Sequence, residues 1–537
     1  MSAPRPASRD SSSLRELALL VDASIETSAD LDVGVTGVTL DSRAVQPGDL
    51  YAALPGARAH GADFAAQAQA AGASAVLTDA DGAERLRAAA VALPALVVEQ
   101  PRAVLGALSA RIYDTTEQSL TMVGITGTNG KTTTAYLVSS ALAVLGHRTG
   151  LIGTVETRIG DERIKSVRTT PEATDLHAIL AVMEERDTDT CVMEVSSHAL
   201  SQHRVDGVVF DLALFTNLSQ DHLDFHADME DYFSAKARLF STEHSLRGLV
   251  CVDDVWGRRL VERSGVPVTT LTTLPDADAD WTVTVDEQEP SRFVLRGRGI
   301  ELDLRSALPG DFNVANTAMA AVALLLLGEE TDAVSRAILT DPHVPGRMER
   351  VTSSTDGDDL LAVVDYAHTP DAVEAALAAL RPSTTGRLVV VLGAGGDRDR
   401  GKRQGMGRAA AGLADAVVVT DDNPRGEDPS SIRAAVLEGA RSVDSSSTLV
   451  EVGGRREAIR EAVRLAREGG PGSVVAVVGK GHETGQEVAG VVHPFDDREE
   501  LRAALDAADG EAGAAGAAGG TTNDETTTTD TDEETTG

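Results

Sequence analysis

Short apolar runs, each followed by a polar residue and then by a helical pattern, recur along this chain. Parallel strands that are covered on both faces read as continuous apolar runs, so this alternation predicts an α/β fold with parallel sheets between layers of helices. Polar residues come at the ends of the runs, where open sheets of this kind bind ligands. The clearest runs are residues 122–126, 191–197, 212–218, 360–368, 388–396, 416–424 and 473–483.

The chain carries a large excess of acidic residues. Asp and Glu number 84 against 48 Lys and Arg in 537 residues, which gives a formal net charge of −36. A nucleic-acid backbone needs a basic surface, so this charge argues against nucleic acid as the main partner. A small anionic substrate in one local basic pocket stays possible. We therefore expect small-molecule partners.

The sequence gives little sign of a membrane or secreted protein. No apolar stretch approaches the roughly 20 residues of a membrane span, and no signal-like apolar run follows the polar N-terminal residues. Only Cys191 and Cys251 occur, which argues against a disulfide scaffold. We expect a cytoplasmic protein without a membrane partner.

The length leaves room for three or four domains. The polar residues 1–13 and the acidic residues 509–537 have compositions that cannot form a core, and we expect both to be disordered. Gly310 starts a helix that runs through Leu327, and a boundary follows near Pro345-Gly346-Arg347. With a second boundary near 118, the expected domains are residues 14–118, 119–345 and 346–508.

A glycine-rich segment directly follows the apolar run 122–126 and opens a helix. Backbone N–H groups of such a loop close around phosphate oxygens, Lys131 reaches the β and γ phosphates of ATP, and Thr132 can ligate Mg²⁺. The strict pattern has Gly where this chain has Ile125, so the loop is a shortened variant. It consists of Gly127, Thr128, Asn129, Gly130, Lys131, Thr132 and Thr133.

Two further residues are candidate metal ligands. Glu194 ends the apolar part of the run 191–197, and His222 follows the run 212–218 within DHLDFH. Both come just past a predicted strand end, on the side of the phosphate loop. A carboxylate and an imidazole beside a nucleotide phosphate suit Mg²⁺. A capped or core histidine would be the plain alternative for His222 if it stood alone.

Lysine is rare in this chain. Arginine serves almost wherever a cation is needed, and the few lysines mark positions that can require a compact, titratable amine. The lysines are Lys131, Lys165, Lys236, Lys402 and Lys480. Lys236, in the helical stretch YFSAK, would otherwise be read as a surface residue.

At this point the motifs resemble those of a known family. TGTNGKTT, EVSSHAL, TNLSQDHLDFH, GRME, DYAHTPD, GAGGDRDRGKR, TDDNPR and VGKGHE occur in this order, and the resemblance to Mur ligases extends over residues 37–500. It implies a UDP-binding N-terminal domain, a central phosphate-loop ATPase domain with a parallel sheet and a Rossmann-like C-terminal domain. It also implies an ATP-dependent ligase of peptidoglycan synthesis that forms a peptide bond through an acyl phosphate. We expect the protein to be a monomer.

The resemblance also assigns roles to individual residues. It implies that Lys236 is carbamylated by CO₂ and that the carbamate holds a second Mg²⁺ beside Glu194 and His222, with Lys131, Lys236, His222 and Glu194 serving catalysis. ATP would be contacted across a domain boundary by Asn316, Arg347 and Asp365, with His368 close by. The substrate UDP-muramoyl dipeptide would be held by Leu40, Ser42, Thr169, Thr170, Ser197, Gln202 and Arg204.

The identity of the added amino acid depends on the DNPR motif. The family divides mainly between enzymes that add meso-2,6-diaminopimelate and enzymes that add L-lysine, which lacks one carboxylate. An arginine fork matches that carboxylate, and the resemblance associates DNPR with diaminopimelate. The expected pocket consists of Arg398, Asp422, Asn423, Pro424, Arg425, Gly479 and Glu483.

Three alternatives stay open on the sequence. The same ligase could add L-lysine. Another enzyme of the superfamily, such as a folylpolyglutamate synthetase, should lack the N-terminal LDSR segment at 40–43 and the DNPR motif. A non-catalytic nucleotide-binding regulator should have lost Lys131, Glu194, His222 or Lys236, and all four are present.

Overall fold

The computed structural model describes residues 3–7, 10–26, 32–116, 119–353, 360–397 and 399–518, with side chains as far as residue 508. The chain divides into two compact units, Met1–Arg347 and Met348–Gly537. Each unit is described by itself. The division lies next to the boundary that the sequence predicts near 346.

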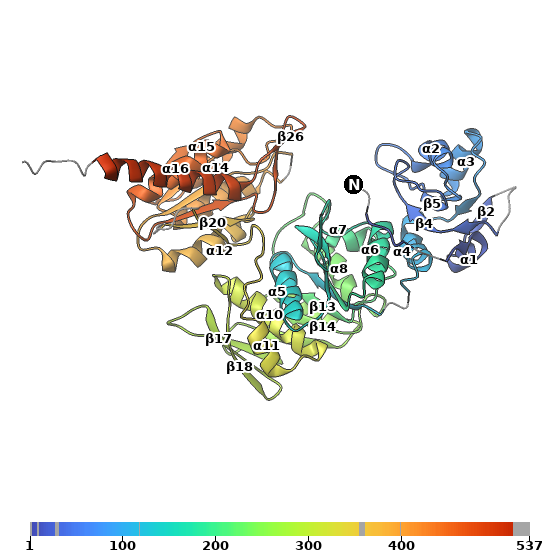
Figure 1. The fold of residues 1–537 in the computed structure, drawn as a ribbon, viewed down its shortest axis with the longest axis horizontal. Helices are drawn as coiled ribbons and strands as arrows, with labels where there is room; N and C mark the ends of the chain where they lie inside the picture. Colours follow the sequence, from blue (N-terminus) through green and yellow to red (C-terminus); the bar gives the residue numbers. More distant parts are fainter. Residues whose placement is uncertain are drawn as a thin grey trace, which may run out of the picture. The chain divides into compact units, whose positions relative to one another are not determined.

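The first unit begins with a small, mostly parallel sheet, drawn in blue in Figure 1. Its order is β2 (Ser24–Glu26), β7 (Ala95–Val97), β6 (Ala75–Thr78), β5 (Asp49–Ala52) and β4 (Gly37–Thr39), with only β2 antiparallel to its neighbour. Apolar residues on both faces pack against helices. The helices are α1 (Leu14–Leu20), η1 (Gly61–Phe64), α2 (Ala65–Ala70), α3 (Ala80–Ala88) and α4 (Pro101–Ile112).

A long mixed sheet forms the rest of this unit. Its parallel centre has the order β9 (Thr149–Ile152), β12 (Thr190–Glu194), β8 (Thr121–Thr126), β13 (Leu212–Phe215), β14 (Gly248–Cys251), β15 (Val268–Thr272) and β16 (Trp281–Val285). Antiparallel strands extend it at both ends: β10 (Glu156–Ile159) and β11 (Glu162–Lys165) on one side, β17 (Arg292–Gly297) and β18 (Ile300–Arg305) on the other.

Helices cover both faces of this sheet, as the continuous apolar runs predict. One face packs against α5 (Lys131–Val144), α10 (Asp311–Leu327) and α11 (Thr331–Ala337). The other packs against α6 (Ala173–Glu185) and α8 (Met229–Ala237). The remaining helices are α7 (Ser197–Ser201), η2 (Arg238–Phe240) and α9 (Val255–Arg263). Helix α10 ends at Leu327, as predicted.

Strand register places the polar strand ends together. Glu194 at the end of β12 pairs with Ile125 of β8, and Phe215 at the end of β13 pairs with Thr126. The segments that follow these strands, including the phosphate loop, therefore start at one edge of the sheet. This is the edge at which ligands bind in open parallel sheets.

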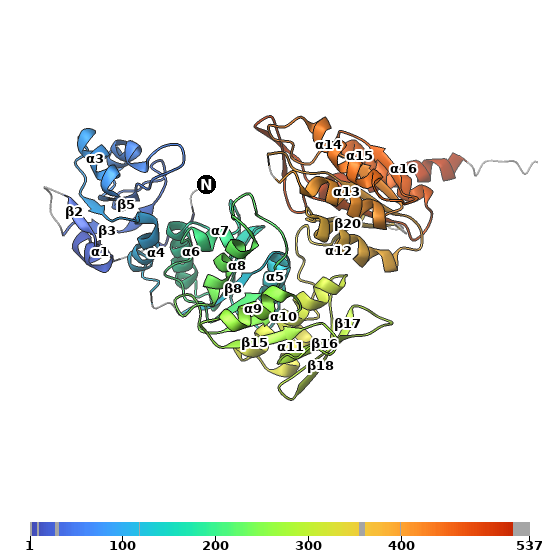
Figure 2. The same ribbon diagram turned by 180° about the vertical axis from the view of Figure 1, so that it is seen from behind.

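The second unit is a doubly covered α/β sheet with the order β19 (Glu349–Val351), β20 (Leu361–Asp365), β24 (Val474–Val478), β21 (Leu388–Leu392), β22 (Ala416–Val419) and β23 (Thr448–Glu451). All neighbours except β19 and β20 are parallel. One face packs against α12 (Pro370–Leu380), α13 (Lys402–Leu413) and α14 (Pro429–Arg441), the other against α15 (Arg455–Glu468) and α16 (Asp497–Ala518). The turn η3 (Arg381–Ser383) and the hairpin β25 (Gly485–Val488)–β26 (Val491–Pro494) complete it. The same elements are visible from behind in Figure 2.

The structure differs from the sequence prediction at both ends. Strand β1 (Ser12–Ser13) pairs with β3 (Gly34–Val35), and Arg5 forms an ion pair with Asp49, within a segment that we expected to be disordered. Composition could not predict this order, because contacts with residues far away in the sequence can order a polar segment. At the other end α16 continues to Ala518, since the alanines after residue 502 favour a helix. The acidic segment 519–537 lies outside the described residues.

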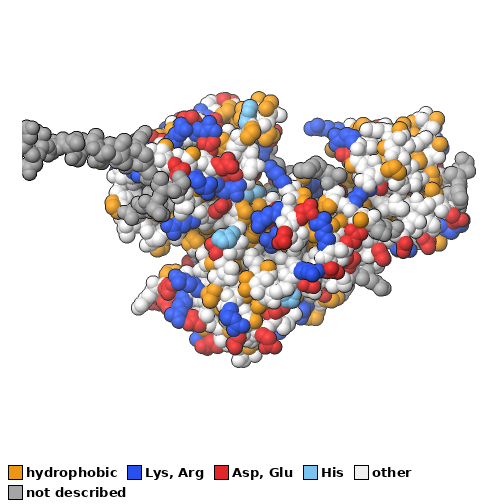
Figure 3. Space-filling model, viewed as in Figure 1, with side chains coloured by type: hydrophobic (Ala, Val, Ile, Leu, Met, Phe, Trp, Pro, Cys, Tyr) orange, Lys and Arg blue, Asp and Glu red, His pale blue; other side chains and the backbone are white. Residues whose placement is uncertain are grey.

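No helix among the described residues is long and apolar enough to cross a membrane. On the face seen in Figure 3, acidic and basic side chains are interspersed. Elsewhere in the first unit, Arg292 pairs with Asp303 and Arg296 with Glu301, and all four side chains are exposed.

Candidate active site

The carboxyl end of β8 leads directly into the glycine-rich loop and then into α5, which is the predicted strand–loop–helix setting. Gly127 and Gly130 have φ angles of 145° and 86°. A Cβ on Gly130 would lie 2.4 Å from Oδ1 of Asn316, so the loop requires glycine there. The N-terminal end of α5 presents backbone N–H groups and the positive end of the helix dipole.

A second loop, directly after β13, fixes the phosphate loop in shape. The backbone N–H groups of Thr128 and Asn129 donate to the carbonyl and side-chain oxygens of Asn217, at 2.9 and 3.0 Å. The Thr216 hydroxyl donates to the Asn129 carbonyl at 2.6 Å. Sequence reasoning assigned no role to Thr216 or Asn217. Their place at the end of a strand beside β8 was the available signal.

Two lysines point at the first carbonyl of the phosphate loop. Nζ of Lys131 donates to the carbonyls of Gly127 and Thr128, both at 2.9 Å, and Nζ of Lys236 donates to Gly127 at 2.8 Å. Lys236 is fully buried, and its Nζ lies 4.7 Å from the centre of the Tyr232 ring. Burial, together with the nearby Lys131 charge, lowers the pKa of Lys236 well below its usual value. Burial also lowers the pKa of Lys131.

Glu194 is buried beside the loop. Its Oε2 accepts from the hydroxyls of Thr132 and Thr154 at 2.9 and 3.1 Å, and its Oε1 accepts from Thr154 N at 2.8 Å. A Cβ on Gly153 would approach Oε1 to 2.5 Å, so the backbone packs closely around this carboxylate. The Glu194 carboxylate and the Thr132 hydroxyl are hard oxygen donors of the kind that Mg²⁺ prefers. This donor set fits a magnesium ion beside bound phosphates.

His222 lies on the loop after β13, with a positive φ of 56°. Its ring is 5.0 Å from that of His198 and 5.9 Å from that of Tyr232. Burial lowers its pKa to about 4, so the imidazole is neutral near pH 7 and able to bind a metal. Across the described part of the chain, no three His, Cys, Asp or Glu side chains form a group that could hold a metal ion. A metal site here would need Thr132, a modified Lys236 or ligand oxygens as well.

The residues expected to contact ATP are divided between the units. In the first, the Asn316 side chain accepts from Thr134 Oγ1 at 3.3 Å, and Arg347 Nη2 donates to Thr132 Oγ1 at 3.3 Å. Both therefore lie at the phosphate loop. In the second, Asp365 ends β20 and its carboxylate accepts from the backbone N–H groups of Met348 and Ala367. Nδ1 of His368 lies 2.9 Å from the Tyr366 carbonyl.

A cavity of about 850 Å³ lies in the first unit, where the small sheet meets the loop before α6. Leu40 and Ser42 both line it, as the resemblance implies, and the Ser42 hydroxyl donates to Gln67 Oε1 at 3.2 Å. Arg102 and Arg168 line it as well, and each donates to Glu172, at 2.9 and 3.0 Å. The cavity is large enough for a nucleotide.

The remaining substrate candidates form a network between Glu194 and this cavity. The Thr170 hydroxyl donates to the Glu194 carbonyl at 2.9 Å, and Arg204 Nη1 donates to the Thr170 carbonyl at 3.2 Å. Arg204 also donates to Gln202 Oε1 at 2.6 Å and pairs with Glu172 at 3.2 Å. Glu172 thus contacts three arginines, a role that the sequence did not suggest.

Two candidates connect to other parts of the site. Thr169 Oγ1 lies 3.0 Å from Thr154 Oγ1, which contacts Glu194. Ser197 Oγ lies 3.0 Å from Nε2 of His226, and Nδ1 of that ring lies 3.2 Å from Asp231. Six of the seven substrate candidates therefore lie on the cavity or on the hydrogen-bonded network between it and Glu194, whereas Ser197 contacts His226 instead.

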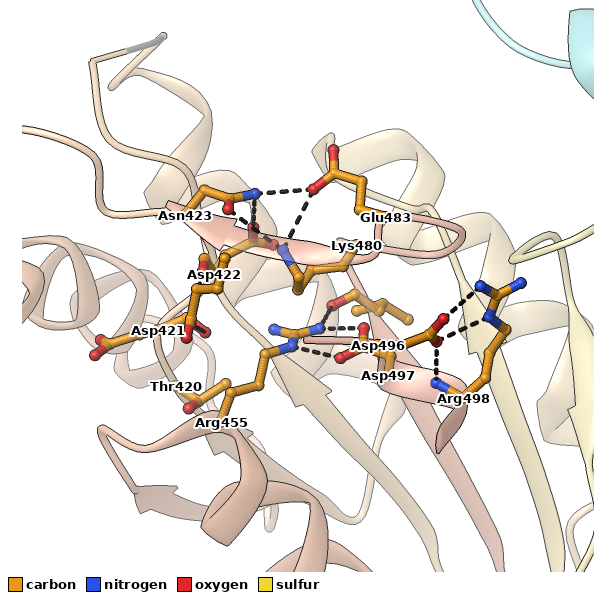
Figure 4. A network of polar contacts seen from close by, with 12 residues as sticks. Thr420, Asp421, Asp422, Asn423, Arg455, Lys480, Glu483, Asp496, Asp497 and Arg498 are labelled. Atoms are coloured by element: carbon orange, nitrogen blue, oxygen red, sulfur yellow. Dashed lines mark hydrogen bonds and ion pairs between the residues drawn. The ribbon is translucent and has the colours of Figure 1, made fainter. Parts of the chain in front are cut away.

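A dense polar network occupies the carboxyl edge of the second sheet (Figure 4). Asn423 Nδ2 donates to Asp422 Oδ1 at 3.0 Å and to Glu483 Oε2 at 2.9 Å. The buried Lys480 Nζ donates to the Asn423 and Glu483 side chains, both at 3.3 Å, and to the Gly485 carbonyl at 2.6 Å. Gly479 has a φ of 117°, and a Cβ there would lie 2.5 Å from Asp422 Oδ2. Asp422, Asn423, Gly479 and Glu483 are therefore brought together.

Arg425 lies at the border of this network, and Pro424 packs against Gly396. Nη1 of Arg425 donates to the Gly396 carbonyl at 2.8 Å, and Nε of Arg425 lies 3.4 Å from Glu487. The side chain is partly exposed, so donors of the guanidinium can reach a ligand. Arg398, the other predicted carboxylate-binding residue, lies outside the described residues.

A glycine-rich loop that opens a helix beside a buried carboxylate is characteristic of proteins that bind nucleoside triphosphates. Family comparisons narrow this class. Residues 34–113 match the Mur ligase family catalytic domain, 125–324 the Mur ligase middle domain, and 346–481 the Mur ligase glutamate ligase domain. The chain belongs to the Mur ligase family.

Individual relatives agree with this assignment. The chain is 55% identical over 512 residues to the UDP-N-acetylmuramoyl-L-alanyl-D-glutamate–2,6-diaminopimelate ligase of Streptomyces avermitilis, which covers 94% of this chain and 99% of that protein. A solved structure of a ligase of that name is 31% identical, has a TM-score of 0.65 and covers 93% of this chain and 100% of the other. The Mycobacterium tuberculosis folylpolyglutamate synthase complexed with ADP is 20% identical with a TM-score of 0.57, covering 70% of this chain and 91% of that one, and shares the fold alone.

Proposed function

We propose that this chain is the ATP-dependent ligase that adds meso-2,6-diaminopimelate to UDP-N-acetylmuramoyl-L-alanyl-D-glutamate in peptidoglycan synthesis. The proposal rests mainly on the carboxyl edge of the second sheet, where the Asn423 amide contacts both Asp422 and Glu483 (Figure 4). Arg425, two residues after Asn423, supplies a partly exposed cation there. The 55% identity to a diaminopimelate ligase supports it. We further propose that the protein acts in the cytoplasm as a monomer on small-molecule substrates.

The first chemical step activates the substrate carboxylate. A free carboxylate resists attack by an amine because its leaving group would be oxide. Transfer of the γ-phosphoryl group of ATP to the carboxylate forms an acyl phosphate and releases ADP. The phosphate loop binds the ATP phosphates through backbone N–H groups, and Lys131 turns its Nζ from the loop carbonyls toward the transferred group. Asn316 and Arg347 fix the nucleotide at the loop.

Magnesium would neutralise charge on the phosphates during this transfer. Thr132 and Glu194 would hold one ion. Their side-chain oxygens are 2.9 Å apart, close enough for both to bind the same ion. His222 and the carbamate of Lys236 would hold a second. The lowered pKa of Lys236 favours the free amine, which is the form that reacts with CO₂.

In the second step the amine of the incoming amino acid attacks the acyl carbon, a C–N bond forms, the amine proton is lost and inorganic phosphate leaves. Asp422 and Glu483 are suited to an ammonium group of diaminopimelate, and Arg425, with Arg398, to its distal carboxylate. Leu40 and Ser42 hold the uridine nucleotide, while Thr169, Thr170, Ser197, Gln202 and Arg204 hold the muramoyl dipeptide.

A ligation assay tests the proposal against its alternatives. Purified protein is given ATP, Mg²⁺, UDP-muramoyl dipeptide and either meso-diaminopimelate or L-lysine, and phosphate release and product mass are recorded. We expect the diaminopimelate product, with phosphate release that depends on the amino acid. A preference for L-lysine would overturn the assigned amino acid but not the ligase. Glutamylation of a folate instead of the muramoyl substrate would overturn the assigned reaction.

A further inference from the structure

The N-terminal segment, residues 3–7, docks across the first unit. Arg5 Nη1 contacts Asp49 Oδ1 of β5 at 2.7 Å. The Ala7 backbone N–H donates to Glu185 Oε2 at the end of α6 at 3.0 Å, and Ala3 packs against the apolar cluster that α6 covers. The segment therefore connects the small sheet with α6, one on each side of the 850 Å³ cavity. Ala3 and Arg5 line that cavity.

The ion pair between Arg5 and Asp49 is built into the sheet. The Asp49 side chain is 1% exposed and that of Arg5 is 17% exposed. The second Asp49 oxygen accepts from Gln46 N at 2.8 Å. A Cβ on Gly37 of the neighbouring strand would lie 2.3 Å from Asp49 Oδ1 and 3.0 Å from Arg5 Nη1. The strand thus leaves space for this pair, which distinguishes it from a chance surface contact.

Arg5 has hydrogen-bonding capacity left over. Its guanidinium carries five N–H donors in a fixed plane. Asp49 is the one acceptor that it contacts, and no described residue accepts from Nε or Nη2. Neither nitrogen is sealed from solvent, so acceptor atoms of a ligand in the cavity can reach these donors. Leu40 and Ser42, the expected nucleotide contacts, line the same cavity.

We propose that the N-terminal segment forms one wall of the nucleotide cavity and that Arg5 donates a hydrogen bond to an oxygen of the uridine diphosphate group bound there. This inference rests on the proposed function, which places that nucleotide in this cavity. Asp49 serves as the positioning residue that orients the Arg5 fork. Residues 3–7 precede the part of the chain that the family domains match, which begins at residue 34.

Titration calorimetry with UDP tests the inference on the full-length chain. Arg5→Met removes the cation, and Arg15→Met is the matched control, because Arg15 is an exposed arginine of the same region. We expect Arg5→Met to raise the Kd for UDP by roughly 10- to 100-fold, the factor that loss of one charge-assisted hydrogen bond produces. Arg15→Met should leave it unchanged. In turnover, the KM for UDP-muramoyl dipeptide should rise while the KM for ATP stays constant.

A second variant separates binding from structural support. Arg5→Met leaves the buried Asp49 carboxylate without its cation, and that alone could disturb the sheet. Combining Arg5→Met with Asp49→Asn removes the stranded charge. If UDP affinity stays low in the double variant, Arg5 contacts the ligand; if wild-type affinity returns, or Arg5→Met binds UDP normally, the inference is overturned. A wild-type chain that binds no UDP would instead overturn the proposed function, and this inference with it.

Discussion

Lys131 and Lys236 direct their Nζ atoms at one oxygen, the carbonyl of Gly127, at 2.9 and 2.8 Å. Two ammonium groups this close repel each other, and burial penalises both charges. The two lysines come from different elements, α5 and α8. Their repulsion is relieved when one of them loses its charge or when an anion binds beside them. The phosphate loop is therefore arranged for a state with bound phosphates.

The first prediction concerns Lys131. Lys131→Ala should lower turnover at least ~100-fold, since it removes the cation that stabilises the transferred phosphoryl group. Phosphate release at saturating substrates measures this, with circular dichroism to establish folding. Lys165→Ala, which removes an exposed lysine in β11, is the control and should behave as wild type. A folded Lys131→Ala variant that keeps more than a few per cent of the activity would contradict the phosphate-loop assignment.

The second prediction concerns Lys236. After incubation with ¹³C-bicarbonate, the wild-type chain should show a carbamate carbon signal that Lys236→Ala lacks, and that variant should lose at least ~100-fold in turnover. The lowered pKa of Lys236 favours the free amine, the form that the modification needs. If the carbamate signal were absent and Lys236→Ala turned over normally, Lys236 would have only a structural role.

The third prediction concerns the choice of amino acid. A charge-assisted pair with a carboxylate is worth ~2–4 kcal/mol once the orphaned partner is counted. Arg425→Ala should therefore lower kcat/KM for meso-diaminopimelate relative to L-lysine by roughly 30- to 1000-fold, with the KM for ATP nearly unchanged. Direct competition between the two amino acids measures the ratio. Arg456→Ala, an exposed arginine on α15, is the control; an unchanged ratio in Arg425→Ala would remove Arg425 from the pocket.

The sheets and the phosphate loop followed from the sequence because they depend on local signals. Apolar runs predicted the central strands, and the glycines before Lys131 predicted the turn into α5, since both patterns are short and have one structural reading. Helix α10 ends where its apolar pattern ends, at Leu327. The roles of Lys236 and Arg204 came only through resemblance, because nothing in their local sequence distinguishes them from surface cations.

Long-range contacts were the part that the sequence did not contain. Arg5 donates to Asp49, which is 44 residues away in the sequence, and Arg102 donates to Glu172, which is 70 residues away. Lys480 was visible as a rare lysine, but its burial against Asn423 and Glu483 depends on how β22 and β24 are placed in the sheet. Such pairings depend on the tertiary fold, which composition and periodicity do not encode.

The fourth prediction concerns the support of the second unit's polar network. Arg455 donates through Nε and Nη2 to Asp497, both contacts being 2.7 Å and both side chains 0% exposed. Arg455→Met should destabilise this unit by ~3–5 kcal/mol, since it leaves a buried carboxylate unpaired. Urea denaturation measures the loss. Adding Asp497→Asn should recover part of it, whereas Arg456→Met, on the exposed side of α15, should cost about 1 kcal/mol or less.

The last prediction concerns acid stability. His177 is fully buried in α6, where its Nε2–H donates to the Asp206 carbonyl at 3.2 Å and its Nδ1 lies 2.6 Å from the Thr115 hydroxyl. Burial lowers its pKa to about 4 from an ordinary 6.5, so the folded chain keeps the ring neutral while the unfolded chain protonates it. Below pH 6.5 the unfolded state binds more protons, and stability falls as pH drops from 6.5 toward 4, by up to roughly 3 kcal/mol. The urea midpoint of the first unit should therefore fall between pH 7 and pH 4.5. In His177→Gln, whose amide can replace both hydrogen bonds without titrating, that fall should be smaller, and an identical pH dependence in the two proteins would show that other groups cause it.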